Sequence, residues 1–384
     1  MKILIDARLY GLENAGLGRY LINLIRELQN IDLKNDYTIF LKKKYYESLI
    51  VPKNWKKVKV NIRHYSLFEQ MFLPLIIKKE NPDLVHFPHF NIPILFNGNF
   101  VVTIHDLLMH REKGTSATTL FPPFYFAKRV GYKKTFKHAV FDSQKIIVPS
   151  NSVKRDIVSY YKIPEEKISV TYEGFDENIH SNLKNGDIFK NFLIDRPYFM
   201  YAGNAYPHKN LKRLIEATQS LNNALGQKIL LVLVCPRNVF VKRLEKSIKF
   251  YKAENSVRII NYISDSILSF LYKNSLGLVY PSFSEGFGLP GLEAMANGTL
   301  ALVSDIAVFK EIYKNHAIYF NPYDFTSIEK EMKEVYAMDL KKRARKVKLA
   351  KSFVKRYSWH KMALETLKIY EETYKKNSLS LRSG

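Results

Sequence analysis

Short apolar runs alternate along this chain with segments whose apolar residues recur every three or four positions. The runs predict buried strands, and the first of them covers residues 2–7. The segment after it places Leu17, Leu21, Leu24, Ile25 and Leu28 on one face of a helix. Further strands are predicted at 37–41, 58–63, 84–87, 100–105, 145–149, 168–172, 198–202, 229–234, 257–261, 276–280 and 300–303. Strands alternating with helices predict parallel sheets covered on both faces.

The length of 384 residues predicts two domains. Residues 176–196 are polar and irregular, so we place the domain boundary there. We expect an N-terminal domain over 1–180, a linker over 181–195 and a C-terminal domain over 196–359. Both halves contain the same alternation of strands and helices.

Residues 281–298, PSFSEGFGLPGLEAMANG, carry the strongest chemical signal in the chain. They follow a predicted strand, and Pro290 and Gly298 mark the start and the end of a short helix. Glycines let a ligand approach the backbone, and the N–H groups that open a helix attract an anion such as phosphate. Glu285 and Glu293 flank this loop eight positions apart, and their carboxylates suit the paired hydroxyls of a sugar. Each glutamate alone could equally be a solvated or helix-capping residue.

This stretch resembles the signature of the retaining, nucleotide-sugar-dependent glycosyltransferases of family 4, in its Glu-x7-Glu spacing and its GFGLP core. The resemblance extends over nearly the whole chain and is closest to the mannosyltransferases of that family, through GNAYPHKN at 203–210 and GFGLPGLEAM at 286–295. It implies the GT-B fold, which is α/β with two doubly wound Rossmann-like domains facing a cleft. It also implies that a helix at about 360–384 packs back on the first domain.

The resemblance assigns roles to residues at matching positions. The loop Gly16, Leu17 and Gly18 would contact the donor diphosphate, as would Asn204 and Lys209 in the second domain. The catalytic residues implied are His105, Lys209 and Glu285: His105 positions the sugar and acceptor, Lys209 stabilises the leaving group, and Glu285 holds the sugar hydroxyls. The remaining donor-binding residues implied are Gly286, Phe287, Gly288, Leu289 and Glu293, the last of which would hold the ribose. The family has Asn-Gly where this chain has Glu173-Gly174, which leaves the role of Glu173 open.

The predicted function is therefore transfer of a hexose, with mannose favoured, from a nucleoside diphosphate sugar to a glycan or lipid-linked acceptor during synthesis of a cell-surface polysaccharide or glycolipid. GDP-mannose is the expected donor. No cofactor and no metal are expected, because no cluster has metal-ligand spacing and the family binds diphosphate without a required metal. A nucleotide-sugar epimerase with the same fold and a polyanion- or nucleic-acid-binding protein are the alternatives.

The net charge of +24 predicts an anionic partner. In residues 118–142, aromatic residues alternate with Lys and Arg, and Phe124, Ala127, Tyr132, Phe136 and Val140 can share one helix face. This helix could lie on an anionic membrane surface, or it could be an ordinary packed helix with a charged outer face. The basic run at 341–348 is interpreted as a solvated helix face, because no nucleic-acid-binding motif accompanies it. The single Cys235 and the lack of an apolar run of roughly 20 residues favour a cytoplasmic protein, peripheral at the inner face of the cytoplasmic membrane.

Overall fold

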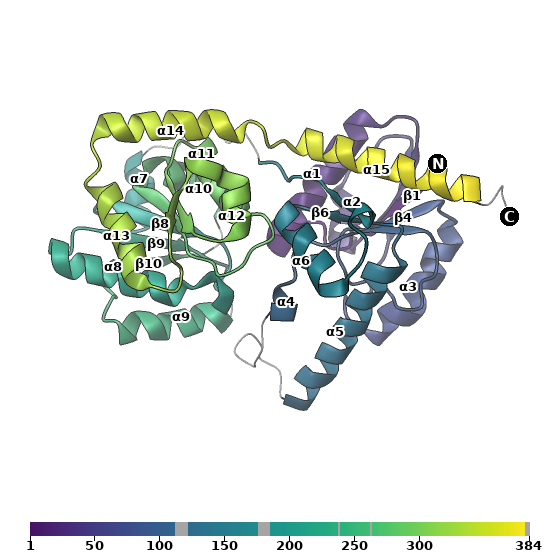
Figure 1. Cartoon of the computed structure of the whole chain (residues 1–384), viewed down its shortest axis with the longest axis horizontal. Helices are drawn as coiled ribbons and strands as arrows, with labels where there is room; N and C mark the ends of the chain where they lie inside the picture. Colours follow the sequence, from purple (N-terminus) through teal and green to yellow (C-terminus); the bar gives the residue numbers. More distant parts are fainter. Residues whose placement is uncertain (112–121, 176–184, 237–238, 262, 381–384) are drawn as a thin grey trace. The chain divides into compact units, whose positions relative to one another are not determined.

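A computed structural model describes residues 1–111, 122–175, 185–236, 239–261 and 263–380 (Figure 1). The chain forms two compact units. The first contains Met1–Gly174 and Ser358–Gly384, and the second contains Phe175–Tyr357. Each unit has its own sheet, and every strand pairing among the described residues is parallel.

The sheet of the first unit has seven strands in the order β3-β2-β1-β4-β5-β6-β7. Most of its strands are short apolar runs buried on both faces, as a sheet covered by helices on both sides requires. The strands are β1 (Lys2–Ile5), β2 (Asp36–Leu41), β3 (Trp55–Lys59), β4 (Leu84–Phe87), β5 (Phe100–Thr103), β6 (Lys145–Val148) and β7 (Ile168–Val170).

The helices of the first unit are α1 (Ala15–Ile31), α2 (Lys43–Ser48), α3 (Leu67–Glu80), α4 (Leu108–Arg111), α5 (Pro122–Asp142), α6 (Asn151–Tyr161) and α15 (Trp359–Ser380). The C-terminal helix α15 packs against α1, and the Tyr370 hydroxyl lies 2.6 Å from Nδ1 of the buried His86 in β4. In another part of the unit, Leu73 and Ile77 of α3 share a core with Phe136 and Val140 of α5. Helices α3 and α5 therefore cover the same part of the sheet.

The sheet of the second unit has six strands in the order β10-β9-β8-β11-β12-β13. Its strands are β8 (Tyr198–Ala202), β9 (Leu230–Val234), β10 (Val257–Ile260), β11 (Gly277–Tyr280), β12 (Ala301–Ser304) and β13 (Ile318–Phe320). Its helices are α7 (Asn185–Asn191), α8 (Leu211–Leu225), α9 (Val239–Phe250), α10 (Asp265–Asn274), α11 (Leu289–Ala296), α12 (Ala307–Tyr313), α13 (Phe325–Tyr336) and α14 (Leu340–Val354). Counted along the chain, both sheets begin in the order 3-2-1-4, as in dinucleotide-binding folds.

The predicted strands at 84–87 and 198–202 have the limits that the structure shows. The limits predicted for the strand at 58–63 are wrong. The structure places β3 at Trp55–Lys59. Trp55 pairs with Tyr37 of β2, and their rings stack 4.2 Å apart. This buried aromatic pair fixes the strand three residues earlier than the β-branched residues suggested.

Part of the expected linker at 181–195 is helical. Residues 185–191 form α7, and the ring of Phe189 packs against those of Tyr198 and Phe270. Residues 188–194 therefore contribute to the second unit, because Ile188 and Ile194 are buried there. Residues 181–184 lie outside the described residues.

Helix α5 corresponds to the aromatic and basic segment considered as a membrane contact. Tyr132, Phe136 and Val140 are buried in the core of the first unit, while Lys133, Lys134 and Lys137 are exposed. Phe136 stacks on Tyr161 of α6 at 5.7 Å. The described part of α5 is therefore a packed helix with a charged outer face. The side chains of Phe124 and Ala127 lie outside the described residues.

Candidate active site

The strand order of the second unit reverses between β8 and β11, which are neighbours in the sheet. In open parallel sheets, ligands bind outside the carboxyl ends of the strands at such a reversal. The two loops that leave this point are residues 203–210, after β8, and residues 281–288, after β11. They contain most of the donor-binding residues expected in this unit.

Asn210 ties these two loops together. It takes the left-handed conformation, with φ 58°, between the 3-10 turn Pro207–Lys209 and α8. Its side-chain amide donates to the carbonyl oxygens of Pro281, at 3.1 Å, and Pro322, at 2.7 Å. The backbone N–H of Phe283 donates to the carbonyl of His208 at 2.8 Å. These bonds hold Lys209 opposite the loop that contains Glu285.

Lys209 and Glu285 form an ion pair at this point. The Lys209 ammonium donates to Glu285 Oε1 at 2.5 Å and to the hydroxyl of Tyr280, the last residue of β11, at 3.2 Å. Only 13% of the Lys209 side chain and 10% of the Glu285 side chain are exposed. A cation and an anion are thus held side by side, where each is partly shielded from water.

The surroundings of the ion pair shift the pKa values of the Glu285 carboxyl group and the Tyr280 hydroxyl group. Burial raises the pKa of Glu285, but the charges of Lys209 and His208 and the hydrogen bonds of Lys209 and Ser282 outweigh it, so the pKa lies below its usual value. Burial raises the pKa of Tyr280 well above its usual range, and the Glu285 and Glu293 carboxylates raise it further. Glu285 is therefore ionised and Tyr280 is neutral at pH 7. Both glutamates act on the same tyrosine.

Gly288 allows the glycine loop to turn into α11. It precedes the helix with φ 108°, a conformation that residues with a Cβ rarely adopt. A Cβ at Gly288 would lie 2.3 Å from the Tyr313 hydroxyl, and that hydroxyl donates to the Gly288 carbonyl. Pro290 has no N–H and the Gly291 N–H donates to the Gly288 carbonyl at 3.2 Å, so the Leu289 N–H is the group in the first turn of α11 that is suited to an anion.

The other donor-site residues expected in this unit lie around the same loops. Phe287 and Leu289 are buried, and Phe287 packs edge-on against Tyr357 at 5.7 Å. Because both side chains are buried, Phe287 and Leu289 can contact a ligand only through their backbone. Gly286 is partly exposed in the loop, and the Asn204 carbonyl accepts from the Tyr201 hydroxyl at 2.7 Å. Glu293, on α11, accepts from the Tyr272 hydroxyl of α10 at 3.3 Å.

His105 follows β5 in the first unit and is held on three sides. Its Nδ1 lies 3.1 Å from Glu173 Oε1, and its Nε2 lies 3.2 Å from the carbonyl oxygen of Pro88. Tyr20 packs edge-on against the imidazole at 4.8 Å. Glu173 is buried, and the next residue, Gly174, has no room for a Cβ because the Trp359 backbone nitrogen would lie 2.1 Å from it. The orientation of His105 therefore depends on Glu173.

The first sheet also reverses, between β1 and β4, and a small hollow with room for little more than a water molecule lies there. Its apolar lining residues are Leu9, Leu17, Leu21 and Phe87, and Asp6, His64, Pro88, His89 and Asn91 line the rest. Burial, assisted by the Arg8 guanidinium, lowers the pKa of His64 to about 4, and burial is the main cause that lowers the pKa of His89 to about 3. Both imidazoles are therefore neutral at pH 7 and can each donate and accept one hydrogen bond.

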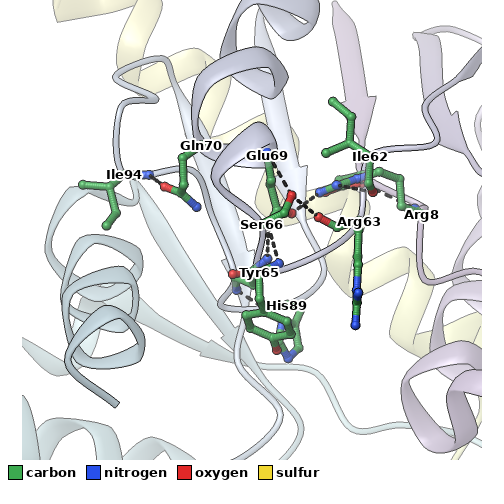
Figure 2. A network of polar contacts seen from close by, with 11 residues as sticks. Arg8, Ile62, Arg63, Tyr65, Ser66, Glu69, Gln70, His89 and Ile94 are labelled. Carbon is green, nitrogen blue, oxygen red and sulfur yellow. Dashed lines mark hydrogen bonds and ion pairs between the residues drawn. The ribbon is translucent and has the colours of Figure 1, made fainter. Parts of the chain in front are cut away.

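Arg8 holds the wall of this hollow in place. Its guanidinium donates to Asp6 Oδ2 at 2.6 Å and to Glu69 Oε1 at 2.7 Å, and all three side chains are almost fully buried. Asn91 donates to Glu69 Oε2 at 2.8 Å. Figure 2 shows Arg8 and Glu69 at the start of α3, with Tyr65 and His89 below them. Arg8 thus pairs with both buried carboxylates, and Asn91 gives Glu69 a further hydrogen bond.

Residues 16–18 were expected to form a loop that contacts the donor diphosphate, and the structure places them at the start of α1. Gly16 lies in the first turn of α1, where a Cβ would meet no other atom within 4 Å. A Cβ at Gly18 would lie 1.8 Å from the Gly11 carbonyl oxygen, so this glycine permits a close approach of two backbone segments. Leu17 lines the hollow. The structure thus groups Lys209, Glu285 and Glu293 in the second unit, and Leu17 and His105 beside Pro88 in the first.

Sequence reasoning missed three residues that position this site. Tyr280 was assigned only to a strand, Asn210 only to a loop, and Glu173 was left without a role. Tyr280 could have been found from its place as the last residue of the strand before the glycine loop. Nothing in the sequence indicated that Asn210 bonds residues 71 and 112 positions away.

Comparison with known proteins gives the family of this fold and site. Residues 15–178 match the family described as Glycosyltransferase Family 4, and residues 185–353 match Glycosyl transferases group 1. The O-antigen chain mannosyltransferase RfbU of Salmonella typhimurium is 30% identical over 263 residues, which cover 68% of this chain and 67% of RfbU. The chain belongs to glycosyltransferase family 4. This glycosyltransferase is also 23% identical to the O-antigen chain mannosyltransferase B of Escherichia coli, over 97% of its own length and all of that protein.

Solved structures agree on the fold of the glycosyltransferase. A glycosyltransferase from Rickettsia africae superposes with a TM-score of 0.71 and 20% identity, over 97% of this chain and 98% of that one. Anabaena HepE, solved in complex with UDP-glucose, has a TM-score of 0.73 and 16% identity, over 97% and 100% of the two chains. WaaG, a glycosyltransferase involved in lipopolysaccharide biosynthesis, has a TM-score of 0.71. These likenesses confirm the predicted GT-B fold class.

Proposed function

We propose that this glycosyltransferase transfers mannose from GDP-mannose, with retention at the anomeric carbon, to a glycan or lipid-linked acceptor in the synthesis of a cell-surface polysaccharide. The likeness to O-antigen mannosyltransferases supports the choice of sugar and pathway. The observation that carries the proposal is the shielded pair of Lys209 and Glu285 at the strand-order reversal of the second unit. One group suits a diphosphate and the other suits sugar hydroxyls.

In the proposed reaction, the bond between the anomeric carbon and the diphosphate oxygen breaks as the acceptor oxygen bonds to the same face of that carbon. The acceptor hydroxyl gives its proton to the departing phosphate oxygen, so no protein base is required. Negative charge grows on the diphosphate as it leaves. The Lys209 ammonium and the N–H groups of residues 286–289 are assigned to that charge, because preorganised donors contribute most when charge develops.

The Lys209–Glu285 bond is then exchanged when donor binds. Lys209 turns its ammonium to the diphosphate, and Glu285 is released to accept hydrogen bonds from the sugar hydroxyls. Glu285 is ionised at pH 7, so it can also stabilise positive charge on the sugar ring. Glu293, whose carboxylate also acts on the pKa of Tyr280, is assigned to the ribose diol.

The acceptor is assigned to the first unit, at the rim of its small hollow. Neutral His64 and His89, together with Asp6 and Asn91, provide hydrogen-bond donors and acceptors suited to hydroxyl groups. His105, oriented by Glu173, is assigned to positioning of the transferred sugar and the acceptor.

We also propose that the enzyme works in the cytoplasm at the inner face of the cytoplasmic membrane, where a lipid-linked acceptor would be presented. None of the helices in the described part of the chain is long and apolar enough to cross a bilayer. The net charge of +24 is consistent with reversible attraction to an anionic surface.

Incubation with a panel of labelled sugar nucleotides tests the proposed donor. We expect slow hydrolysis of GDP-mannose, and faster release of GDP when mannose-containing glycan fragments are added. Release of UDP from UDP-glucose, with no release of GDP from GDP-mannose, would contradict the choice of donor. Interconversion of sugar nucleotides without any transfer would favour an epimerase, and salt-sensitive RNA binding without turnover would favour a polyanion-binding protein.

A further inference from the structure

One face of α3 exposes a continuous row of large apolar side chains. Leu67 is 81% exposed and Phe68 is 68% exposed, and Met71, Phe72 and Leu75 continue the row at helical spacing. The opposite face of the same helix buries Leu73 and Ile77 in the core. Helix α3 is thus apolar on both sides, which is unusual for a helix at the surface of a single unit.

The row extends beyond the helix. The Gln70 side chain accepts from the Ile94 backbone N–H at 2.8 Å, which holds the exposed residues Ile94 and Leu95 next to α3 (Figure 2). Phe68 and Phe72 stack on each other at 5.8 Å. We call the set Leu67, Phe68, Met71, Phe72, Leu75, Ile94 and Leu95 the α3 patch.

Helix α3 is firmly anchored, so the exposure of the α3 patch does not reflect a poorly packed helix. Ser66 caps its first turn by accepting from the Glu69 N–H at 3.2 Å. The buried Glu69 carboxylate accepts from Arg8 at 2.7 Å and from the Tyr65 N–H at 2.7 Å (Figure 2). The apolar face is therefore presented to solvent by a fixed element.

The exposed charges around the α3 patch are mainly cationic, because Glu80, the last residue of α3, is largely buried and pairs with Lys56 at 2.5 Å. From residue 61 to residue 79 the only carboxylate is that of Glu69, which is buried and paired. Arg63 at one end of the helix, and Lys78 and Lys79 at the other, are exposed. The Lys128 ammonium, from α5, lies 5.6 Å from the centre of the Tyr65 ring. An apolar surface bordered by cations complements the acyl chains and anionic headgroups of a lipid bilayer.

We propose that the α3 patch is a membrane-docking surface, and that its occupant is the surface of a bilayer containing anionic lipid. The side chains of Leu67, Phe68, Met71, Phe72 and Leu75 enter the boundary between headgroups and acyl chains, and Arg63, Lys78 and Lys79 contact the phosphates. The buried aromatic face of α5 takes no part in the contact. This inference rests on the proposed location at the membrane, and it can fail without affecting the proposed sugar transfer.

Vesicle flotation of the full chain tests the proposal, with vesicles of phosphatidylcholine alone and of phosphatidylcholine with phosphatidylglycerol, and with no sugar nucleotide or acceptor present. We expect binding to the acidic vesicles that falls sharply at about 0.5 M salt. The double variant Phe68→Ser/Phe72→Ser should bind about tenfold more weakly or worse, because two large apolar side chains no longer leave water. The matched control Phe250→Ser/Leu340→Ser, at exposed apolar positions of the second unit, should bind like wild type.

A second pair of variants tests the charged border. Lys78→Glu/Lys79→Glu should weaken binding to acidic vesicles, whereas Lys341→Glu/Lys342→Glu on α14 should weaken it much less. All four pairs change exposed residues, and unchanged thermal melting would verify that each variant is folded. No binding by wild type, or equal binding by wild type and Phe68→Ser/Phe72→Ser, would overturn the proposal. A wild-type dimer in light scattering that becomes monomeric in Phe68→Ser/Phe72→Ser would overturn it too, because the patch would then cover a second copy of the chain.

Discussion

The Lys209 ammonium lies 2.5 Å from Glu285 Oε1, although the two residues are 76 positions apart in the chain. They meet because β8 and β11 are neighbours in the sheet and both loops leave at their carboxyl ends. Each group neutralises the other. In the function that we propose, a diphosphate sugar separates the two charges.

Removal of the donor-binding charges should abolish most of the activity. We expect Lys209→Ala and Glu293→Ala each to lower kcat/KM by about 10²-fold or more, as for loss of a contact that strengthens in the transition state. Lys212→Ala is the matched control, because Lys212 is an exposed cation on α8 whose ammonium lies over the Phe250 ring. Its kcat/KM should stay near that of wild type. Near-normal turnover in both Lys209→Ala and Glu293→Ala would refute the assignment.

The ion pair should also govern the stability of the second unit and its dependence on pH. The folded pKa of Glu285 is below its ordinary value of 4.5, so the pair's contribution is fully present above about pH 4.5 and is lost as pH falls through the folded pKa. Lys209→Met leaves a shielded carboxylate without its cation, which should cost about 1–3 kcal/mol at pH 7.

Urea unfolding of the variants between pH 4 and pH 7 measures this effect. Lys209→Met removes the largest influence that lowers the pKa of Glu285, so burial, opposed only by His208 and Ser282, should raise that pKa, and the gain in stability with rising pH should shrink or reverse. Lys209→Met/Glu285→Gln should recover part of the loss, because the unpaired charge is gone. An unchanged midpoint in Lys209→Met at pH 7 would show that the pair is not shielded as the structure indicates.

Substitution of Gly288 should impair both folding and donor binding. Gly288→Ala brings a methyl group to 2.3 Å from the Tyr313 hydroxyl at a φ of 108°, so the start of α11 must move. Gly226→Ala is a control at φ 70° with no atom within 4 Å, and it should cost only about 1 kcal/mol of stability. Thermal melting and the KM for the donor distinguish the two variants. Equal effects of both would mean that contact with Tyr313 is unimportant.

Glu173 should act through His105. Glu173→Gln keeps an acceptor for Nδ1 but removes the negative charge, so we expect kcat to fall about tenfold with a smaller change in KM. In a His105→Ala background the same change should have almost no further effect, because residues that act as a unit are not additive. Additive losses of the two substitutions would show that Glu173 has a separate role.

The regular part of the fold was predictable because it depends on local patterns. Buried strands such as β4 and β8 are short apolar runs bounded by polar or turn residues, so their limits could be located from sequence. The limits of β3 could not, because they depend on Trp55 stacking against Tyr37 of another strand. The packing of α5 could not be predicted either, because the spacing of apolar residues does not say whether a helix face contacts a protein core or a membrane.

The glycine loop and the charged residues of the candidate site were proposed from the sequence, through the resemblance of 281–298 to a family signature, and the structure brings Lys209 and Glu285 together. The contacts among them were not, because they are set by strand order. Tyr280, Asn210 and Glu173 became visible only when the sheet brought distant loops together. The exposed row on α3 also escaped notice, because LFEQMFLPLII resembles a buried helix in sequence.

Calorimetric titration of GDP-mannose into wild type and Lys209→Met tests the central claim, that the Lys209–Glu285 pair separates to bind a diphosphate sugar. Wild type should bind, and Lys209→Met should bind about tenfold more weakly or worse, because a charge-assisted bond to the diphosphate is lost. Equal affinities of the two proteins for GDP-mannose would contradict the account.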